Sequence, residues 1–194
     1  MTAFLEARQY FDQVKRMIDT LDGQFETFVD RLHAAYDNRR TLFLFGNGGS
    51  AAGASHFAQD LNKGTVLDVR QTKRFRAIAL TDNVSFLTAL ANDDGYDSVF
   101  VEQLLTLGCP GDVAIAISCS GNSPSVLNAI DYANANGMAT IGVTGGNGGR
   151  LRQAAQISVV VPSDNIGLVE AVHSVLFHAA VSQLRSRLHS TARA

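Results

Sequence analysis

The stretch TLFLFGNGGSAAGASHFAQDLNKG, residues 41–64, is the part of the chain around which the rest is arranged. Residues 42–45 are apolar and predict a short buried strand. The next four residues, GNGG, remove side-chain bulk and allow positive φ, so the backbone can turn sharply and approach a ligand. Ser50 is a suitable N-cap for a helix predicted over residues 51–61. A strand, a glycine turn and a helix N-terminus together predict an anion-binding site.

Two side chains on the predicted helix, His56 and Asp60, are spaced i, i+4 and share one face. A lone histidine favours a structural role, but a histidine and a carboxylate on one face have the geometry of metal ligands. The loop is not a P-loop, because Ser50-Ala51 stands where Lys-Ser/Thr is required, and Ala51 also replaces the third glycine of a dinucleotide fingerprint. Taken alone, the loop leaves an ordinary strand-to-helix turn open.

Composition indicates one globular domain. The chain has 194 residues, of which 46% are hydrophobic, and its formal net charge of −2 does not favour a nucleic-acid partner. Two cysteines, Cys109 and Cys119, imply no disulfide framework and fit a reducing cytoplasm. The charged N-terminus is unlike a signal peptide, and no apolar run approaches the ~20 residues of a membrane span. We therefore expect a cytoplasmic protein without a membrane partner.

Further apolar segments predict strands at residues 76–80, 113–117, 139–143 and 157–161, with helices between them. This alternation predicts an α/β fold with a doubly wound, five-stranded parallel sheet. Two amphipathic helices within residues 1–40 come first, and their apolar faces suit packing on the sheet or on a second subunit. No linker separates them, so residues 1–194 are expected to form one domain.

A second loop, SCSGNSPS at residues 118–125, follows the predicted strand 113–117, and Pro124 suits a first helical turn. Its hydroxyl and N–H groups are typical of a phosphate site. Both loops lie at the carboxyl ends of strands, where doubly wound sheets bind ligands. A basic cluster, Arg70, Lys73, Arg74 and Arg76, is interpreted as a solvated loop, with phosphate contact as the alternative.

Three motifs, FGNGGSAA with a following HF, ISCSGNSPSV and VTGGNGG, resemble the SIS (sugar isomerase) domain. The finer pattern resembles the phosphoheptose isomerase family, which has a GNGGS loop, a helix with HFAEEL, a central Asn-Asp pair, an STSGNS loop and a last helix of the form QxxHxxxxH. Here these motifs fall on residues 46–50, 56–61, 92–93 and 118–123, and on Glu170, His173 and His178. Five motifs in order over nearly the whole chain are far more specific than one.

The resemblance implies a role for each matching residue. The phosphate would be held by Ser118, Cys119, Ser120 and Ser123. The rest of the substrate would be bound by Asn47, Gly48, Gly49, Ser50, Asp60, Asn92, Asp93 and Glu170. A zinc ion would be bound by His56, Asp60, Glu170 and His178, and Asp60 with His178 would form the catalytic acid/base pair.

Two residues depart from the family pattern. The family's Glu is Asp60 here, which shortens the reach of the catalytic base by one methylene, and the family's Gln is Glu170, which adds a negative charge. Two imidazoles and two carboxylates suit a divalent metal such as zinc. Cys119 also stands where the family has Thr, a smaller change because backbone N–H groups do much of the phosphate binding.

The last helix leaves one question open. Glu170 and His178 are about two turns apart, roughly 12 Å along the axis, so either the side chains lean together or the site joins two chains. Helix geometry favours His173 as the partner of Glu170, whereas the family pattern favours His178, and either histidine could lie in the core. The resemblance implies a homotetramer with sites at subunit contacts, and the apolar faces of the first and last helices agree with an oligomer.

The resulting hypothesis is an aldose–ketose isomerase. It would convert sedoheptulose 7-phosphate to a D-glycero-heptose 7-phosphate through a cis-enediol, for heptose precursor biosynthesis, with a proton leaving C1 and returning at C2. The alternatives are a non-catalytic SIS-domain protein that binds a replication initiator, and a sugar-phosphate sensor. Asp60, Glu170 and His178 together favour chemistry. Substrates of five or six carbons remain open.

Overall fold

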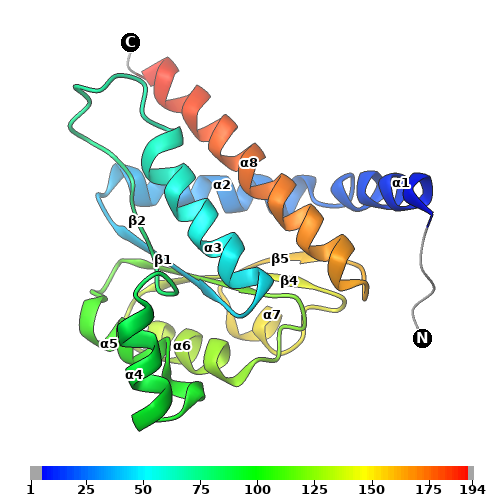
Figure 1. Cartoon of the computed structure of the whole chain (residues 1–194). Helices are drawn as coiled ribbons and strands as arrows, with labels where there is room; N and C mark the ends of the chain where they lie inside the picture. Colours follow the sequence, from blue (N-terminus) through cyan, green and yellow to red (C-terminus); the bar gives the residue numbers. More distant parts are fainter. Residues whose placement is uncertain (1–5, 192–194) are drawn as a thin grey trace.

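The computed structural model describes residues 6–191 and has a central sheet between two layers of helices (Figure 1). Residues 1–5 of the expected N-terminal extension lie outside the described residues. The strands are β1 (Thr41–Gly46), β2 (Arg76–Ala79), β3 (Val113–Ser118), β4 (Ala139–Gly145) and β5 (Ile157–Val161). The α-helices are α1 (Ala7–Ile18), α2 (Asp22–Asp37), α3 (Gly49–Gln59), α4 (Val84–Asp93), α5 (Val101–Leu107), α6 (Pro124–Ala135), α7 (Leu151–Ala154) and α8 (Ile166–Thr191). Two short segments complete the elements, the π-helical turn η1 (Asp60–Gly64) and the 3-10 turn η2 (Tyr96–Ser98).

The five strands are all parallel and lie in the order β2-β1-β3-β4-β5, which confirms the predicted doubly wound sheet. The chain order reverses between β1 and β3, and this switch point is where such sheets bind ligands. Gly46 of β1 is in register with Ile117 of β3, so the glycine loop and the serine loop leave the sheet side by side. The topology therefore brings the two predicted anion sites to one place.

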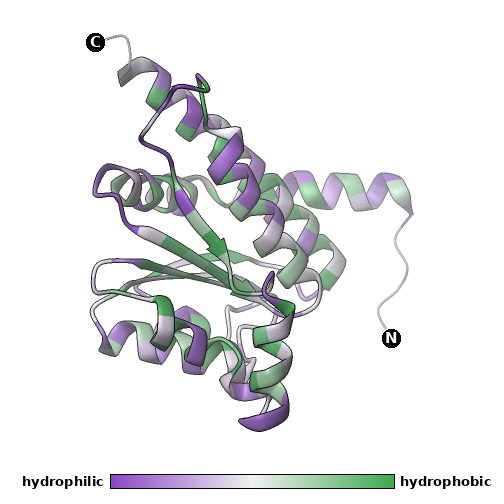
Figure 2. Cartoon of the chain, turned by 60° about the vertical axis from the view of Figure 1, so that its left-hand side comes forward, coloured by the Kyte–Doolittle hydropathy of each residue, from purple (hydrophilic) through white to green (hydrophobic). Residues whose placement is uncertain are grey.

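Alternate residues of each strand enter two separate cores. Leu42 and Leu44 of β1 face α2, α3 and α8, whereas Phe43 and Phe45 face α4, α5, α6 and α7. All four side chains are buried, and burying one of this size stabilises the fold by about 1.5–3 kcal/mol. Figure 2 shows the result, with apolar strands inside and polar residues on the outer helix faces. Burial on both faces explains why the strands are nearly continuous apolar runs.

The helices at the two ends of the chain lie against each other. Helix α2 packs on β5 and α8, while α1 contacts α8 and extends beyond the sheet (Figure 1). In α1 no residue is buried, and its Phe11 side chain is 67% exposed. Among the described residues, α8 alone is long and apolar enough to span a membrane by length and composition. That test is also passed by core helices, and α8 buries eight hydrophobic residues between Leu168 and Leu188.

Two local predictions need correction. Ser50 is not the N-cap of α3: Gly48 takes that position at φ 57°, and Ser50 lies inside the first turn, where it is buried. The helix predicted to end at residue 61 changes at Asp60 into a π-helical turn. Asn92 and Asp93 form the last turn of α4. Tertiary packing decides such ends more than propensity does.

Candidate functional site

The glycine loop is shaped by contact with β3. A methyl group on Gly46 would lie 2.5 Å from the carbonyl oxygen of Ile117, so the position accepts only glycine at this spacing. Asn47 follows and is held at both ends of its amide: Nδ2 donates to Ser125 Oγ at 3.1 Å, and Oδ1 accepts from the Tyr96 hydroxyl at 2.8 Å. These bonds tie the loop to the first turn of α6 and to η2.

The serine loop forms a tight turn between β3 and α6. The N–H of Gly121 donates to the hydroxyl and to the carbonyl of Ser118, at 3.2 and 3.0 Å, and Ser120 Oγ accepts from the N–H of Asn122 at 3.3 Å. Ser123 is the N-cap of α6, and Pro124 occupies the first helical turn as predicted. The positive end of α6 therefore points toward a loop of hydroxyl groups, which suits a phosphate.

The turn after β4 supports the serine loop from behind. Gly121, at φ 63°, lies so close to the backbone of Gly148 that an added methyl would meet its carbonyl carbon at 2.7 Å. The N–H of Leu151 donates to the Gly121 carbonyl at 2.9 Å, and the N–H of Arg150 donates to Asn122 Oδ1 at 3.1 Å. The VTGGNGG motif, residues 143–149, therefore has a structural role, because its backbone packs against the serine loop and limits the conformations of that loop.

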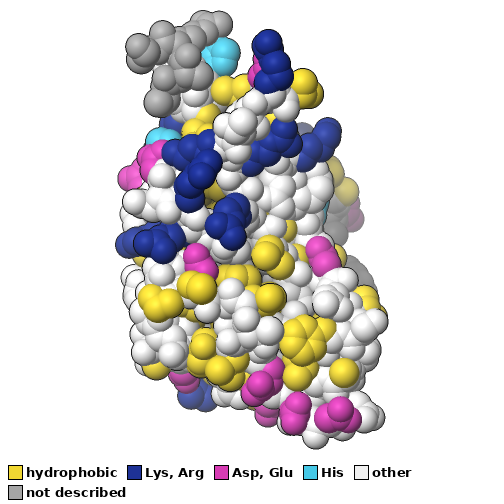
Figure 3. All heavy atoms as spheres, turned by 90° about the vertical axis from the view of Figure 1, so that its left-hand side faces the viewer, with side chains coloured by type: hydrophobic (Ala, Val, Ile, Leu, Met, Phe, Trp, Pro, Cys, Tyr) yellow, Lys and Arg dark blue, Asp and Glu magenta, His cyan; other side chains and the backbone are white. Residues whose placement is uncertain are grey.

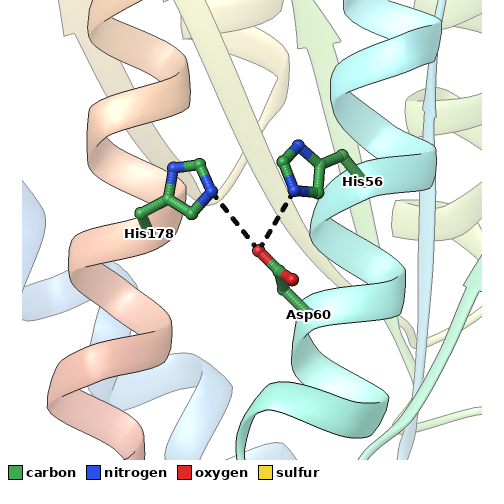
Figure 4. A group of neighbouring side chains, drawn as sticks. All are labelled: His56, Asp60 and His178. Carbon is green, nitrogen blue, oxygen red and sulfur yellow. Dashed lines mark ion pairs between the residues drawn. The ribbon is translucent and has the colours of Figure 1, made fainter.

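Three of the four predicted metal ligands come together between α3 and α8. One oxygen of Asp60 lies 3.5 Å from Nε2 of His56 and 3.5 Å from Nε2 of His178 (Figure 4). The three ligand atoms all lie within 4.8 Å of one another. Asp60 is partly buried, with 20% of its side chain exposed, while both imidazoles are more than half exposed. The cluster therefore opens to solvent on its imidazole side.

The donor set of this cluster suits a cation. Nδ1 of His178 lies 2.9 Å from the carbonyl oxygen of Ser174, which can only accept, so Nδ1 carries the proton in this bond. In a neutral His178 the lone pair of Nε2 then faces the Asp60 carboxylate. Two electron-rich groups at 3.5 Å are stabilised by a proton or a metal ion between them. The residues present thus fit a zinc ion.

Glu170 lies near this cluster but outside it. Among the described residues, the group whose ligand atoms all lie within 4.8 Å does not include Glu170. Its carboxylate packs against the backbone of Gly49, where an added methyl would meet the carboxyl carbon at 2.8 Å. Glu170 lines a cavity of about 240 Å³ together with Ser50, His56 and Ile117. The prediction that Glu170 is a metal ligand therefore stays a prediction.

Cys119 connects this cavity to the serine loop. Its half-buried sulfur lies 4.0 Å from the hydroxyl of Ser50, and its carbonyl accepts from the N–H of Gly145 at 3.0 Å. Burial raises the pKa of the Cys119 thiol, and the negative charge of Glu170 raises it further, against a lowering by the Ser50 hydrogen bond. The thiol thus stays protonated at neutral pH, as a polar neutral group beside the predicted phosphate position.

His173 is a core histidine. It is 3% exposed, and its Nε2 lies 3.1 Å from the carbonyl oxygen of Thr144 at the end of β4. Burial lowers the pKa of His173 to about 4, so the imidazole is neutral at physiological pH and donates to that carbonyl. Its role is therefore to fix α8 on the sheet, and the structure gives the Asp60 contact to His178.

The remaining predicted residues lie at the surface. Asn92 and Asp93 are exposed, and Nδ2 of Asn92 donates to Oδ1 of Asp93 at 2.6 Å. Their substrate role stays a prediction. Figure 3 shows Lys and Arg side chains gathered on the face beside β2. In the basic cluster of residues 70–76, Arg70 pairs with Asp68 at 2.7 Å and Lys73 with Asp37 at 3.0 Å, which supports the interpretation as a solvated charged loop.

Two features of the site are marked by no sequence pattern. Tyr96 reaches Asn47 from a 3-10 turn after Gly95, and nothing in its neighbourhood marks it as a loop anchor. The π-helical turn at Asp60 has no recognised sequence signature, although such turns are frequent at functional sites.

Comparison with known proteins agrees with this geometry. A family model described as the SIS domain matches residues 8–145. A phosphoheptose isomerase of Bradyrhizobium sp. is 41% identical over 81% of this chain and 78% of its own length. That of Aliarcobacter butzleri is 38% identical over 89% of each chain. The structure of phosphoheptose isomerase GmhA from Neisseria gonorrhoeae superposes with a TM-score of 0.84, at 30% identity over 92% of this chain and 94% of that one.

Sequence identity above 30% over most of both chains, together with the shared arrangement of elements, decides the family. The resemblance expected from five short motifs is confirmed. The chain belongs to the phosphoheptose isomerase family of SIS-domain proteins.

Proposed function

We propose that the protein is an aldose–ketose isomerase that converts sedoheptulose 7-phosphate to a D-glycero-heptose 7-phosphate. The observation that carries this proposal is the meeting of Asp60 and His178, from α3–η1 and from α8, at 3.5 Å beside a cavity that adjoins the serine loop. A carboxylate and an imidazole in contact next to an anion site are what proton transfer on a sugar phosphate requires.

The serine loop would bind the phosphate and fix one end of the open-chain substrate. The N-terminus of α6 supplies a positive potential, and Ser118, Ser120 and Ser123 supply hydroxyl groups around it. Fixing the phosphate holds the far carbonyl end at a set distance from the acid/base pair, which removes much of the entropy cost of the reaction. Asn47 and Glu170 border the same region and would orient the chain between its ends.

At the reacting end, one member of the Asp60–His178 pair takes the proton from C1 and the other moves protons between the two oxygens. A cis-enediol forms, and protonation at C2 gives the aldose. Each such positioned group contributes about 10²–10⁴-fold to the rate. The Asp60 carboxylate lies 3.5 Å from Nε2 of His178, so the shorter side chain still brings the two members of the pair together.

We also propose a zinc ion held by His56, Asp60 and His178, with Glu170 as a fourth ligand. The support is the donor set, two imidazole nitrogens and a carboxylate oxygen within 4.8 Å, together with the tautomer that Ser174 imposes on His178. Such an ion supplies Lewis-acid polarisation of the substrate carbonyl. Metal analysis of the purified protein should find about one zinc per chain, and a His56→Ala variant should lose it; equal zinc in both would contradict this site.

We further propose that the protein is a homotetramer in the cytoplasm. Helix α1 extends beyond the sheet, and the exposed side chains Phe11 (67%) and Val175 (42%) leave apolar area on α1 and α8 that a partner subunit would cover. An apolar groove of about 220 Å³ lies between α2 and α8, bordered by Phe25 and Leu176. Sedimentation analysis should give a tetramer, and a Phe11→Asp variant should dissociate. A stable, fully active monomer would contradict this assembly.

The test of function is a coupled assay on sedoheptulose 7-phosphate, with ketose phosphates of five and six carbons for comparison and with and without a chelator. We expect turnover of the seven-carbon substrate and reduced turnover after chelation. An Asp60→Asn variant should bind the sugar phosphate but turn it over at least about a hundredfold more slowly. Absence of turnover in the wild-type protein would overturn the proposal and favour a sugar-phosphate-binding role.

A further inference from the structure

The π-helical turn η1 holds Asp60 in place through contacts that the proposed chemistry does not use. Asp60 is its first residue and Gly64 its last. A π-helical turn is wider than an α-turn and is rarely stable unless neighbours support it. Because Asp60 has a short side chain, its backbone must be placed accurately for the carboxylate to reach His178 on another helix. The position of Asp60 therefore depends on the contacts that hold the π-helical turn in place.

The first support comes from β2. Nδ2 of Asn62 donates to the carbonyl of Ala77 at 2.7 Å, and the N–H of Ala77 donates to Oδ1 of Asn62 at 2.9 Å. One side-chain amide thus binds both backbone groups of a residue on the outer edge of the sheet, as a neighbouring strand would. Only an amide can donate and accept in this way, so a carboxylate of the same shape cannot replace it.

The second support comes from α8, directly beyond His178. An added methyl on Gly64 would lie 3.1 Å from Cγ1 of Val181, so the π-helical turn and α8 approach as closely as a glycine allows. Nη1 of Arg185 donates to the carbonyl of Gly64 at 3.1 Å. Val181 and Arg185 follow His178 by about one and two helical turns, so these contacts set the spacing of the two elements that carry the acid/base pair.

We propose that Asn62, Gly64 and Arg185 are positioning residues that set the separation between Asp60 and His178, by clamping the π-helical turn to the sheet edge and to α8. The expected loss of kcat rests on the proposed function. The expected change in the distance between Asp60 and His178 does not depend on it. Displacement of a catalytic group by about 1 Å can cost on the order of 10²-fold in rate. The effect should fall on kcat, because none of these three residues belongs to the predicted substrate site.

The experiment compares two amides with matched surroundings. Asn62→Asp keeps the shape of the side chain but loses the donor to Ala77. Asn134→Asp is the control: Asn134 is also partly buried, and its amide donates to the Ala154 carbonyl at 2.8 Å and accepts from the Thr140 hydroxyl at 2.8 Å and from the Gln156 amide at 3.4 Å. It lies on α6, which packs on the opposite face of the sheet from α3 and η1. Both variants should lose similar thermal stability, so a difference in kcat between them reports the position of Asp60 relative to His178.

We expect Asn62→Asp to lower kcat at least about tenfold, with KM changed less than about threefold, while Asn134→Asp keeps both. Gly64→Ala should act like Asn62→Asp. Arg185→Met should also lower kcat, and Arg185→Lys, which keeps a donor, should recover part of the loss. In an Asp60→Asn background the Asn62→Asp change should have no further effect on residual turnover. Equal kcat in the Asn62→Asp and Asn134→Asp variants would overturn the proposal.

A crystal structure of the Asn62→Asp variant provides the readout that needs no activity. The distance from Asp60 Oδ2 to His178 Nε2, 3.5 Å in the native chain, should lengthen beyond about 4 Å. An unchanged distance would refute the clamp even if the wild-type protein proved to have no isomerase activity. If the Asn62→Asp protein does not fold, the same measurement on Gly64→Ala decides.

Discussion

The serine loop depends on a backbone contact at Gly121 that tolerates no side chain. In a Gly121→Ala variant the new methyl would meet the carbonyl carbon of Gly148 at 2.7 Å and the Cα of Gly149 at 3.2 Å. Both are backbone atoms and cannot rotate away. The residue is also at φ 63°, which costs an alanine about 1–2 kcal/mol. Relief of the collision costs about 1–3 kcal/mol more, so we expect a loss of about 2–5 kcal/mol in unfolding free energy.

For a chain of this size that loss corresponds to a fall in Tm of about 4–20 °C. The matched control is Gly137→Ala, which has a similar φ of 72° but would contact Pro110 at an ordinary 3.5 Å, after α6. The Gly137→Ala variant should lose only the free energy that the left-handed backbone conformation costs an alanine, about 1–2 kcal/mol. Thermal unfolding of both variants, with and without inorganic phosphate, is the assay. Saturating phosphate at a hundredfold excess over Kd should stabilise the wild type and Gly137→Ala by about 2.7 kcal/mol, but not Gly121→Ala. Equal Tm losses with phosphate stabilisation retained in both would refute this account of the loop.

Two further predictions follow from groups beside the site. Because the folded His173 has a pKa of about 4 and the unfolded imidazole one of 6.5, acidification through this window protonates the unfolded chain first, so unfolding free energy should fall by up to about 3 kcal/mol. Denaturant titrations of wild type and His173→Gln across this range measure the difference, and identical pH profiles would contradict it. Because burial raises the pKa of the Cys119 thiol, an alkylating reagent should modify the exposed Cys109 first, as peptide mass spectrometry can follow; equal rates would contradict the placement of Cys119.

The sheet was predictable from the sequence because strands buried on both faces must be apolar throughout, as residues 42–45 and 113–117 are. The two loops were predictable because glycine and serine runs between a strand and a helix are typical of sharp turns whose backbone N–H groups can bind an anion. Helix ends were less well predicted. The N-cap at Gly48 instead of Ser50 results from packing of Ser50 under the serine loop, which no local pattern records.

The pairing of Asp60 with His178 could not be derived from spacing, because it depends on how α8 crosses the end of α3. Helix geometry favoured His173 over His178 as the partner of Glu170, but His173 points to the Thr144 carbonyl in the core. The pairing of Asp60 with His178 came from the family resemblance, and the two side chains lie 3.5 Å apart. The π-helical turn, which brings Asp60 within reach of α8, had no sequence signal, since its supports at Asn62 and Arg185 come from contacts distant along the chain.

Proton exchange catalysed by this site is the most direct measure of the whole account. Sedoheptulose 7-phosphate incubated with the wild-type protein in D2O should yield aldose that carries deuterium at C2, as seen by NMR, because an enediol intermediate exchanges its proton with solvent-accessible groups. An Asp60→Asn variant should slow this exchange by at least about a hundredfold while binding of the sugar phosphate is retained. Exchange at the wild-type rate in Asp60→Asn would contradict the claim that Asp60 and His178 perform the chemistry.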